Sequence, residues 1–215
     1  MPRTTGFSIY LAAIAAIALD WSSARASDED TQFWFAAGHK FVLGDHAKAN
    51  MEVSTRAREG NDLTFGRAWA DLDLSDHFGM SGGMAYYDFG DGHEVRPYQE
   101  ADLSAGFLSS RTRLEERFIH GSSRAQIRLR ERVQASFRLA RATMLRGSGE
   151  MFYVLRSEYR VGDPQPVHWR AIGELEHHLT AHITGGIGYQ LTYAKRHGMG
   201  SEVSHFPRIR LSMLL

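Results

Sequence analysis

The sequence from Arg124 to Leu139 alternates between polar and apolar residues, and this pattern constrains the fold more than any other feature. Its even positions, from Arg124 to Arg138, are all polar, and its odd positions, from Ala125 to Leu139, are apolar except for Glu131. Because successive side chains of a β-strand point to opposite faces, the segment predicts a strand with one charged face and one apolar face. Sixteen residues is long for a strand of a soluble sheet. Repeated along an exported chain, such a strand indicates a membrane barrel with lipid outside and a charged interior.

The first 26 residues have the layout of a secretory signal peptide. Arg3 supplies the positive n-region, residues 7–19 form the apolar segment, and Ala24-Arg25-Ala26 fits the cleavage motif. Thirteen apolar residues are too few for a comfortable membrane span, which disfavours a retained anchor. We therefore expect a signal peptide at 1–26 and an exported domain at 27–215, located in the bacterial outer membrane.

The composition excludes several classes of protein. The chain has no cysteine, which excludes a disulfide scaffold and a thiolate-bound metal. Its 25 basic and 25 acidic residues leave no basic excess for binding nucleic acid. Beyond the N-terminus no apolar segment is long enough for a transmembrane helix, so a membrane would be crossed by strands. We expect one domain, no cofactor and no nucleic-acid partner; the expected partners are outer-membrane lipid and the barrel-assembly machinery.

The alternation recurs in segments that are separated by turn residues such as Gly44-Asp45, Gly90-Asp91-Gly92 and Gly121-Ser122-Ser123. Eleven strands can be assigned in this way, at residues 32–43, 46–58, 63–74, 78–89, 97–107, 110–119, 124–139, 148–157, 167–179, 182–193 and 203–215. The prolines of the exported domain are expected in loops or at strand ends. Single-chain bacterial barrels have even strand numbers, and roughly 15–16 residues per strand and connection fit this length with about 12. The sequence thus predicts an all-β transmembrane antiparallel β-barrel of about 12 strands, with 10 as the alternative.

Aromatic residues fall mostly near the ends of the predicted strands, as Tyr98, Phe107, Phe118, Phe152 and Phe206 do. Membrane barrels carry aromatic girdles at both interfaces with water. Aromatic residues also favour strands of any kind. We expect most of these rings to belong to such girdles.

One motif resembles a known family. The sequence RTRLEERF at Arg111–Phe118, the Arg-rich strand after it, Glu150-Met151-Phe152 and Gly188-Tyr189 together resemble a bacterial outer-membrane family called domain of unknown function 2490. The likeness runs from about Trp34 to the C-terminus. The resemblance implies a β-barrel of the outer-membrane type, and it implies no particular activity.

The charged face of the strands supplies the candidate site residues, which we expect to line the interior. They are Glu100, Asp102, Arg111, Arg113, Glu115, Arg117, Arg128, Arg130, Arg132, Glu174, Glu176, Arg208 and Arg210. With a four-residue loop at 120–123, Glu115 faces Arg128 across two strands. Arg113 then faces Arg130, and Arg111 faces Arg132. These two pairs repel unless acids from other strands intervene, so their arginines are candidates for an unpaired cluster.

The same side chains support two functions. Arginine and glutamate from facing strands can pair and plug the interior, which would give a closed barrel with a structural or envelope-maintenance role. Alternatively, surplus guanidinium groups line a water-filled path, where their planar forks attract carboxylates or phosphates. The predicted interior holds more basic than acidic residues and is similar to that of small bacterial porins for acidic sugars. The leading interpretation is passive passage of small anionic solutes.

The signals for an enzyme or a metal site are weak. Residues 120–122 (His-Gly-Ser) have the H-x-S spacing of lipid A deacylases without their surrounding residues, so a lipid-modifying enzyme ranks third. His177 and His178 point to opposite faces of a strand, so only one of them can meet His182, which is too few ligands for zinc. The glycines of 185–188 lack the lysine of a phosphate-binding loop and fit a strand beside a bulky neighbour. We therefore predict no catalytic residues and no metal site.

Overall fold

The part of the chain that the structure describes is one closed β-barrel. This computed structural model describes residues 28–31, 33–57, 63–158, 168–195 and 201–214, and every regular element within these ranges is a strand. The signal peptide expected at 1–26 lies outside the described residues. Within them, no helix has the length and hydropathy needed to span a membrane.

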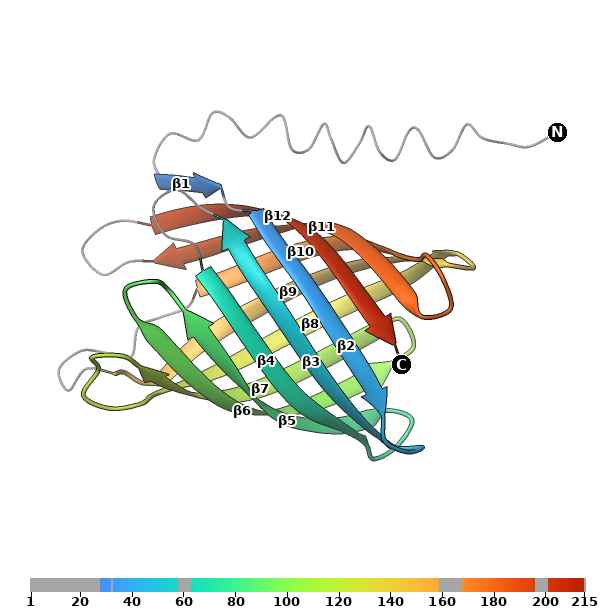
Figure 1. Cartoon of the computed structure of the whole chain (residues 1–215), viewed down its shortest axis with the longest axis horizontal. Coiled ribbons are helices and arrows are strands. Elements are labelled where there is room, and N and C mark those ends of the chain that lie inside the picture. The colour runs from blue at the N-terminus through green and yellow to red at the C-terminus, as the bar shows by residue number, and fades with distance from the viewer. Residues whose placement is uncertain (1–27, 32, 58–62, 159–167, 196–200, 215) are drawn as a thin grey trace.

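The strands follow one another around the wall in chain order (Figure 1). Their bounds are β1 Asp28–Thr31, β2 Phe33–Val42, β3 Ala47–Ala57, β4 Leu63–Asp73, β5 Phe78–Asp88, β6 His93–Ala105, β7 Leu108–Ile119, β8 Gln126–Ala140, β9 Thr143–Arg156, β10 His168–His178, β11 Ile183–Lys195 and β12 Ser201–Leu214. From β2 to β12 each strand pairs antiparallel with the next. The eleven segments of alternation in the sequence correspond to β2–β12.

The wall has eleven strands, and the prediction of about 12 strands, or of 10, is wrong. β12 pairs in parallel with β2, from Arg208 opposite Trp34 to Leu214 opposite Lys40. β1 pairs in parallel with an earlier part of β12, so β1 and β2 share one position in the wall. With an odd number of strands the first and last run in the same direction, so the barrel closes through a parallel pair. The prediction relied on the even strand numbers of bacterial barrels, a regularity of the class that the alternation itself does not impose.

The two ends of the barrel differ in the length of their connections. Residues 43–46, 74–77, 106–107, 141–142 and 179–182 form turns of two to four residues at one end, which we call the short-turn end. At the opposite end, four to eleven residues separate consecutive strands, and we call it the long-loop end. Gly90 and Gly121, at predicted turns of that end, take φ values of 82° and 77°, which favour glycine.

The two faces of the wall have opposite character. On β8 the side chains of Gln126, Arg128 and Arg130 are buried, whereas those of Val133 and Phe137 are about half exposed. Large apolar side chains are exposed on every strand from β2 to β12, among them Val53, Leu72, Met84, Leu103, Phe118, Leu155, Ile187 and Ile209. The charged face therefore points into the barrel and the apolar face points out, which is the arrangement of a barrel in lipid.

Proline departs from the expected positions. Pro97 lies within β6, which begins at His93, four residues before the predicted start. The ladder between β6 and β7 pairs Val95 and Tyr98 but skips Arg96 and Pro97, because proline has no N–H to donate. Pro207 lies within β12, between the segment that pairs with β1 and the segment that pairs with β2. Both prolines are tolerated where a ladder is interrupted.

Candidate functional site

The register of β7 and β8 brings the predicted charged residues together inside the barrel. Glu115 lies opposite Arg128, Arg113 opposite Arg130, and Arg111 opposite Arg132, as the sequence predicts. In the last two of these pairs, an arginine of β7 therefore faces an arginine of β8. Their repulsion has to be offset by carboxylates from elsewhere.

Glu115 offsets part of this repulsion between arginines, because three arginines surround its carboxylate. The Glu115 side chain is 1% exposed. Nε and Nη2 of Arg128 donate to its Oε2 at 2.9 and 2.5 Å. Nη1 of Arg113 lies 3.4 Å from its Oε1, to which Arg130 also donates. A single carboxylate thus links β7 to two arginines of β8.

Glu100 on β6 and Glu150 on β9 supply the remaining acids. Nη2 of Arg113 donates to Oε1 of Glu100 at 2.8 Å. Nε and Nη2 of Arg130 donate to Oε1 of Glu150 at 3.1 and 2.8 Å, while Arg170 of β10 donates to the other oxygen. Arg113 and Arg130, two of the candidates for an unpaired cluster, are therefore paired, because Glu100 and Glu150 on the neighbouring strands β6 and β9 intervene.

Arg111 and Arg132 lie at the edge of this network. Nε of Arg111 is 2.8 Å from Oε2 of Glu100, and its Nη2 is 4.0 Å from Glu150. Arg132 forms no hydrogen bond or ion pair with the side chains that the structure describes. Asp102, opposite Arg111 across β6 and β7, is half-buried. Among the described side chains, Arg132 is therefore the arginine of this network that no carboxylate pairs with.

A second cluster lies nearer the long-loop end, around Glu94. This side chain is 1% exposed and accepts hydrogen bonds from two guanidinium groups. Arg96 donates at 2.5 and 2.9 Å and Arg117 at 2.5 and 2.8 Å, both in the two-pronged manner of an arginine fork. Nη1 of Arg117 also donates to Gln126 at 2.5 Å. Glu94 and Arg96 were not predicted as interior residues from the sequence, although they are spaced by two residues from each other and from Tyr98, across Pro97.

A third cluster faces the short-turn half of the barrel. Nη2 of Arg67 lies 3.0 Å from Glu52. Nη2 of Arg210 lies 3.0 Å from Glu174 and also contacts Glu176, which binds Arg146 as well. Gly186 faces the same space, and a Cβ there would lie 2.9 Å from Oε1 of Glu174, so glycine leaves room for the cluster. The sequence predicted Glu174, Glu176 and Arg210 but not Arg67, which lies on a strand with weaker alternation. Arg146 was also not predicted, because β9 begins at Thr143, before the predicted start at residue 148.

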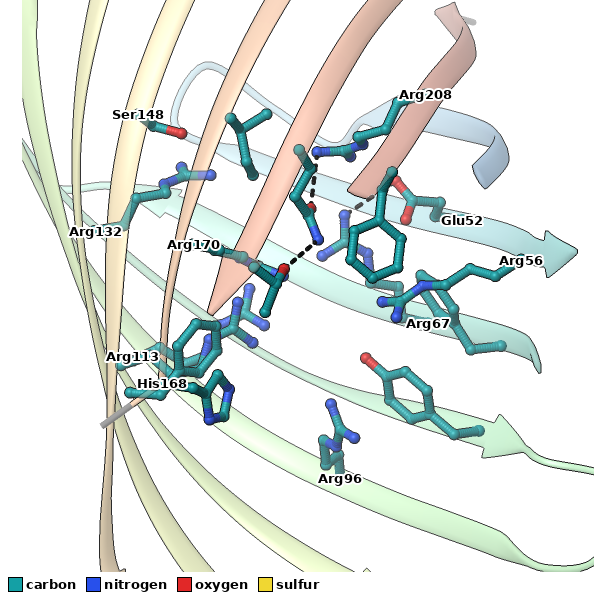
Figure 2. Close-up of a pocket in the computed structure, with 18 of the residues that line it drawn as sticks. Glu52, Arg56, Arg67, Arg96, Arg113, Arg132, Ser148, His168, Arg170 and Arg208 are labelled. Carbon is teal, nitrogen blue, oxygen red and sulfur yellow. Dashed lines mark hydrogen bonds and ion pairs between the residues drawn. The ribbon is translucent and has the colours of Figure 1, made fainter. Parts of the chain in front are cut away.

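These clusters surround a cavity of about 520 Å³ (Figure 2). Thirteen arginines line it: Arg56, Arg67, Arg96, Arg111, Arg113, Arg117, Arg128, Arg130, Arg132, Arg146, Arg170, Arg208 and Arg210. Glu52 and Glu174 are its acidic lining residues. The carboxylates of Glu94, Glu100, Glu115 and Glu150 do not line it and are 1–5% exposed, so they lie behind the guanidinium groups. The surface that a solute would meet is therefore positively charged.

A second cavity of about 440 Å³ lies toward the short-turn end. Its lining includes Lys40, Asp71, His178 and His182. Glu52, Arg67, Arg146 and Arg210 line both cavities, so they lie between the two. We call these four residues, with the partners Glu174 and Glu176, the constriction.

Aromatic rings also face the interior, contrary to the expectation that most belong to outer girdles. Tyr98, Phe152 and Phe206 are buried, whereas Phe107 and Phe118 are exposed on the outside as expected. The guanidinium carbons of Arg128, Arg130 and Arg170 lie 4.9 to 5.1 Å from the centroid of Phe152, whose ring stacks on His168 at 4.1 Å. Cation–π contacts of this kind favour close packing of arginines. Phe152 is two residues from Glu150, so the two-residue period of a strand places both side chains on the same, inward face. This period is the sequence signal for the inward position of Phe152.

The weak motifs found in the sequence lie at the two ends of the barrel. His120 packs against His93 with ring centroids 4.9 Å apart, and Ser122 lies in the adjacent turn. His177 and His178 do point to opposite faces, since they contact Thr143 and Thr184 respectively at 2.9 Å. In the described part of the chain, no three His, Cys, Asp or Glu side chains are grouped so that they could hold a metal ion.

Comparison with known proteins places this barrel in a family. A family model described as protein of unknown function (DUF2490) matches residues 31–202. The chain belongs to this family. Among solved structures, the barrel is similar to the NanC porin, with a TM-score of 0.60 and 15% sequence identity over 86% of this chain and 99% of that chain. At this identity the similarity shows a porin-like β-barrel fold.

The translocator domain of the autotransporter NalP from Neisseria meningitidis is also similar, with a TM-score of 0.43 and 13% identity over 77% of this chain and 74% of that chain. No curated protein matches the sequence. The DUF2490 family is described as proteins of unknown function, so membership assigns no activity to this chain.

Proposed function

We propose that this DUF2490 protein is an outer-membrane barrel through which small anionic solutes pass passively. The observation that carries the proposal is the cavity lined by thirteen arginines, behind which four paired glutamates are almost completely buried. Guanidinium groups bind carboxylates and phosphates through two parallel hydrogen bonds. A cavity lined mainly by one sign of charge also concentrates counter-ions of the opposite sign.

The outer surface supports the location. Exposed apolar side chains on all strands of the wall suit contact with lipid tails, and the porin-like fold agrees with this. Membrane barrels of this type have short periplasmic turns and longer external loops. The short-turn end would then face the periplasm, with the second cavity on that side of the constriction.

The constriction determines how a solute would cross. Its three arginines and three glutamates are paired with one another, so its net charge is zero, unlike that of the larger cavity. A solute that moves between the cavities has to pass these ion pairs. We therefore expect the arginine-lined cavity to attract anions and the constriction to set the size limit. An unpaired charge at Glu52 or Arg67 of the constriction would raise or lower the anion preference, because these residues also line the larger cavity.

Recordings of the folded protein in planar bilayers test the proposal. We expect a conductance that favours anions over cations in a potassium chloride gradient. The preference should weaken between 0.1 and 1 M salt, because the screening length falls from about 10 Å to about 3 Å. Glu52→Gln should increase the anion preference and Arg67→Gln should decrease it, since each leaves one unpaired charge of known sign at the constriction.

Glu116→Gln is the matched control, because Glu116 is exposed on the outer face and should not change selectivity. Cation preference, or no response to either constriction variant, would contradict the proposal. The paired constriction also favours the alternative of a closed structural barrel. If the folded protein gives no conductance, the closed structural barrel is the interpretation that remains.

A further inference from the structure

We propose that Arg132 on β8 and Ser148 on β9 form a discrete oxyanion-binding site inside the larger cavity. The site deepens the proposed function, on which it rests, because it names the place where an anionic solute would be held. It would take a carboxylate or a phosphate group, and both present two or more oxygens to a planar donor.

Arg132 has its donors available for such a group. Its neighbours across the two strand pairs are Arg111 on β7 and Glu150 on β9. Glu150 already accepts hydrogen bonds from Arg130 and Arg170. Among the side chains that the structure describes, Arg132 has neither a hydrogen bond nor an ion pair. A guanidinium group carries five N–H donors, and leaving them without acceptors in a partly buried position costs free energy that a bound anion would recover.

Ser148 lies where it can complete the site. It pairs with Gln134 across β8 and β9, so it is the diagonal neighbour of Arg132 on the inward face. The hydroxyl of Ser148 has no hydrogen-bond partner among the described residues. Figure 2 shows Arg132 and Ser148 on the same side of the cavity, with the guanidinium group directed into it. A serine hydroxyl and an arginine fork are both donors to an oxyanion.

The surrounding charges favour a bound anion at this point. Along the row of paired residues, Arg111 lies next to Arg132 on one side, and Arg170 lies beyond Glu150 on the other; both arginines line the cavity. The nearest carboxylates, Glu100 and Glu150, are held by other arginines and are at most 5% exposed. An anion here therefore meets positive charge without a competing exposed carboxylate.

Isothermal titration of the folded protein in detergent micelles tests the site. Inorganic phosphate and citrate are the two probes, each titrated at constant ionic strength against a chloride background. We expect saturable binding of at least one probe, and the probe that binds distinguishes a phosphate site from a carboxylate site. Arg132→Gln should weaken that binding about tenfold or more, since hydrogen bonds to charged groups contribute this much. Ser148→Ala should weaken it by a smaller factor.

Arg138→Gln is the matched control, because Arg138 also lies on β8 but is exposed and does not line the cavity. Arg132→Lys keeps the charge but loses the fork, so it should bind with an affinity between those of the native protein and Arg132→Gln. Absence of binding by the native protein, or equal weakening by Arg138→Gln and Arg132→Gln, would overturn the site. Titration does not require conduction, so a conducting protein without binding overturns this site alone, and a binding protein without conductance overturns the channel alone.

Discussion

At the scale of single residues, the interior is stabilised by carboxylates that several guanidinium groups share. Glu115 contacts Arg113, Arg128 and Arg130, and Glu150 contacts Arg130 and Arg170. Breaking a buried ion pair by removing one partner is much more costly than the pair is worth, because the other charge stays buried without compensation. The carboxylates are therefore the residues whose loss the barrel tolerates least.

Glu115→Gln should destabilise the barrel by about 3–5 kcal/mol, because three arginines lose their shared counter-charge at a site that is 1% exposed. Reversible unfolding in urea, in the presence of lipid vesicles, measures the change. Glu116→Gln, one residue away on the exposed outer face, should change stability by less than about 0.5 kcal/mol. Equal losses for the two variants would show that Glu115 has no special place in the network.

At the scale of the strand, the two-residue period separates an apolar outer surface from a charged inner one. β5 is a clear example, because its outward residues lie beside uncharged neighbours. Met84 pairs with Ala68 and Pro97, and Met80 pairs with Leu72 and Ala101. Both methionines are about half exposed, although they differ in depth along the strand. Met84 lies near the middle of Phe78–Asp88, and Met80 lies near its beginning.

Met84→Arg should therefore cost about 2–4 kcal/mol of folding stability in lipid, whereas Met80→Arg should cost about 0–1 kcal/mol. The difference arises because a charge near the bilayer midplane is far from water and a charge near the interface is not. Unfolding measurements in vesicles compare the two variants under the same conditions. Costs that do not depend on depth would argue against a lipid-facing surface on β5.

At the scale of the whole molecule, closure through a parallel pair distinguishes this barrel from one with an even strand number. Ala37 of β2 lies opposite Leu211 of β12, and both residues are exposed on the outer face. Adjacent strands are about 4.8 Å apart, which lies within the range of Cα separations that a disulfide bond spans. The chain has no cysteine of its own, so introduced cysteines report on this contact without background.

Ala37→Cys combined with Leu211→Cys should form an intramolecular disulfide on oxidation, detected by mass spectrometry and by migration on non-reducing gels. Ala37→Cys combined with Ile187→Cys is the control, because Ile187 lies on β11, beyond β12. That pair is more than two strand spacings apart, since Ile187 pairs with Ile209 and not with Leu211, and it should remain reduced. Failure of the first pair to cross-link in folded protein would mean that a further strand separates β2 from β12.

The local pattern of the chain determined the strands, their faces and much of the interior set. A two-residue period is visible within a few residues, so the eleven wall strands, the inward position of Arg128 and the register of Glu115 with Arg128 were predictable. The tertiary structure alone decided the rest. Which carboxylate pairs with which arginine depends on how neighbouring strands are brought together, as Glu150 on β9 shows by binding Arg130 of β8 and Arg170 of β10. Parallel closure likewise depends on how the whole wall is staggered, because every strand contributes to that geometry and no single segment contains it. The same holds for Arg132, which lies opposite Glu150 but forms no hydrogen bond or ion pair with the described side chains.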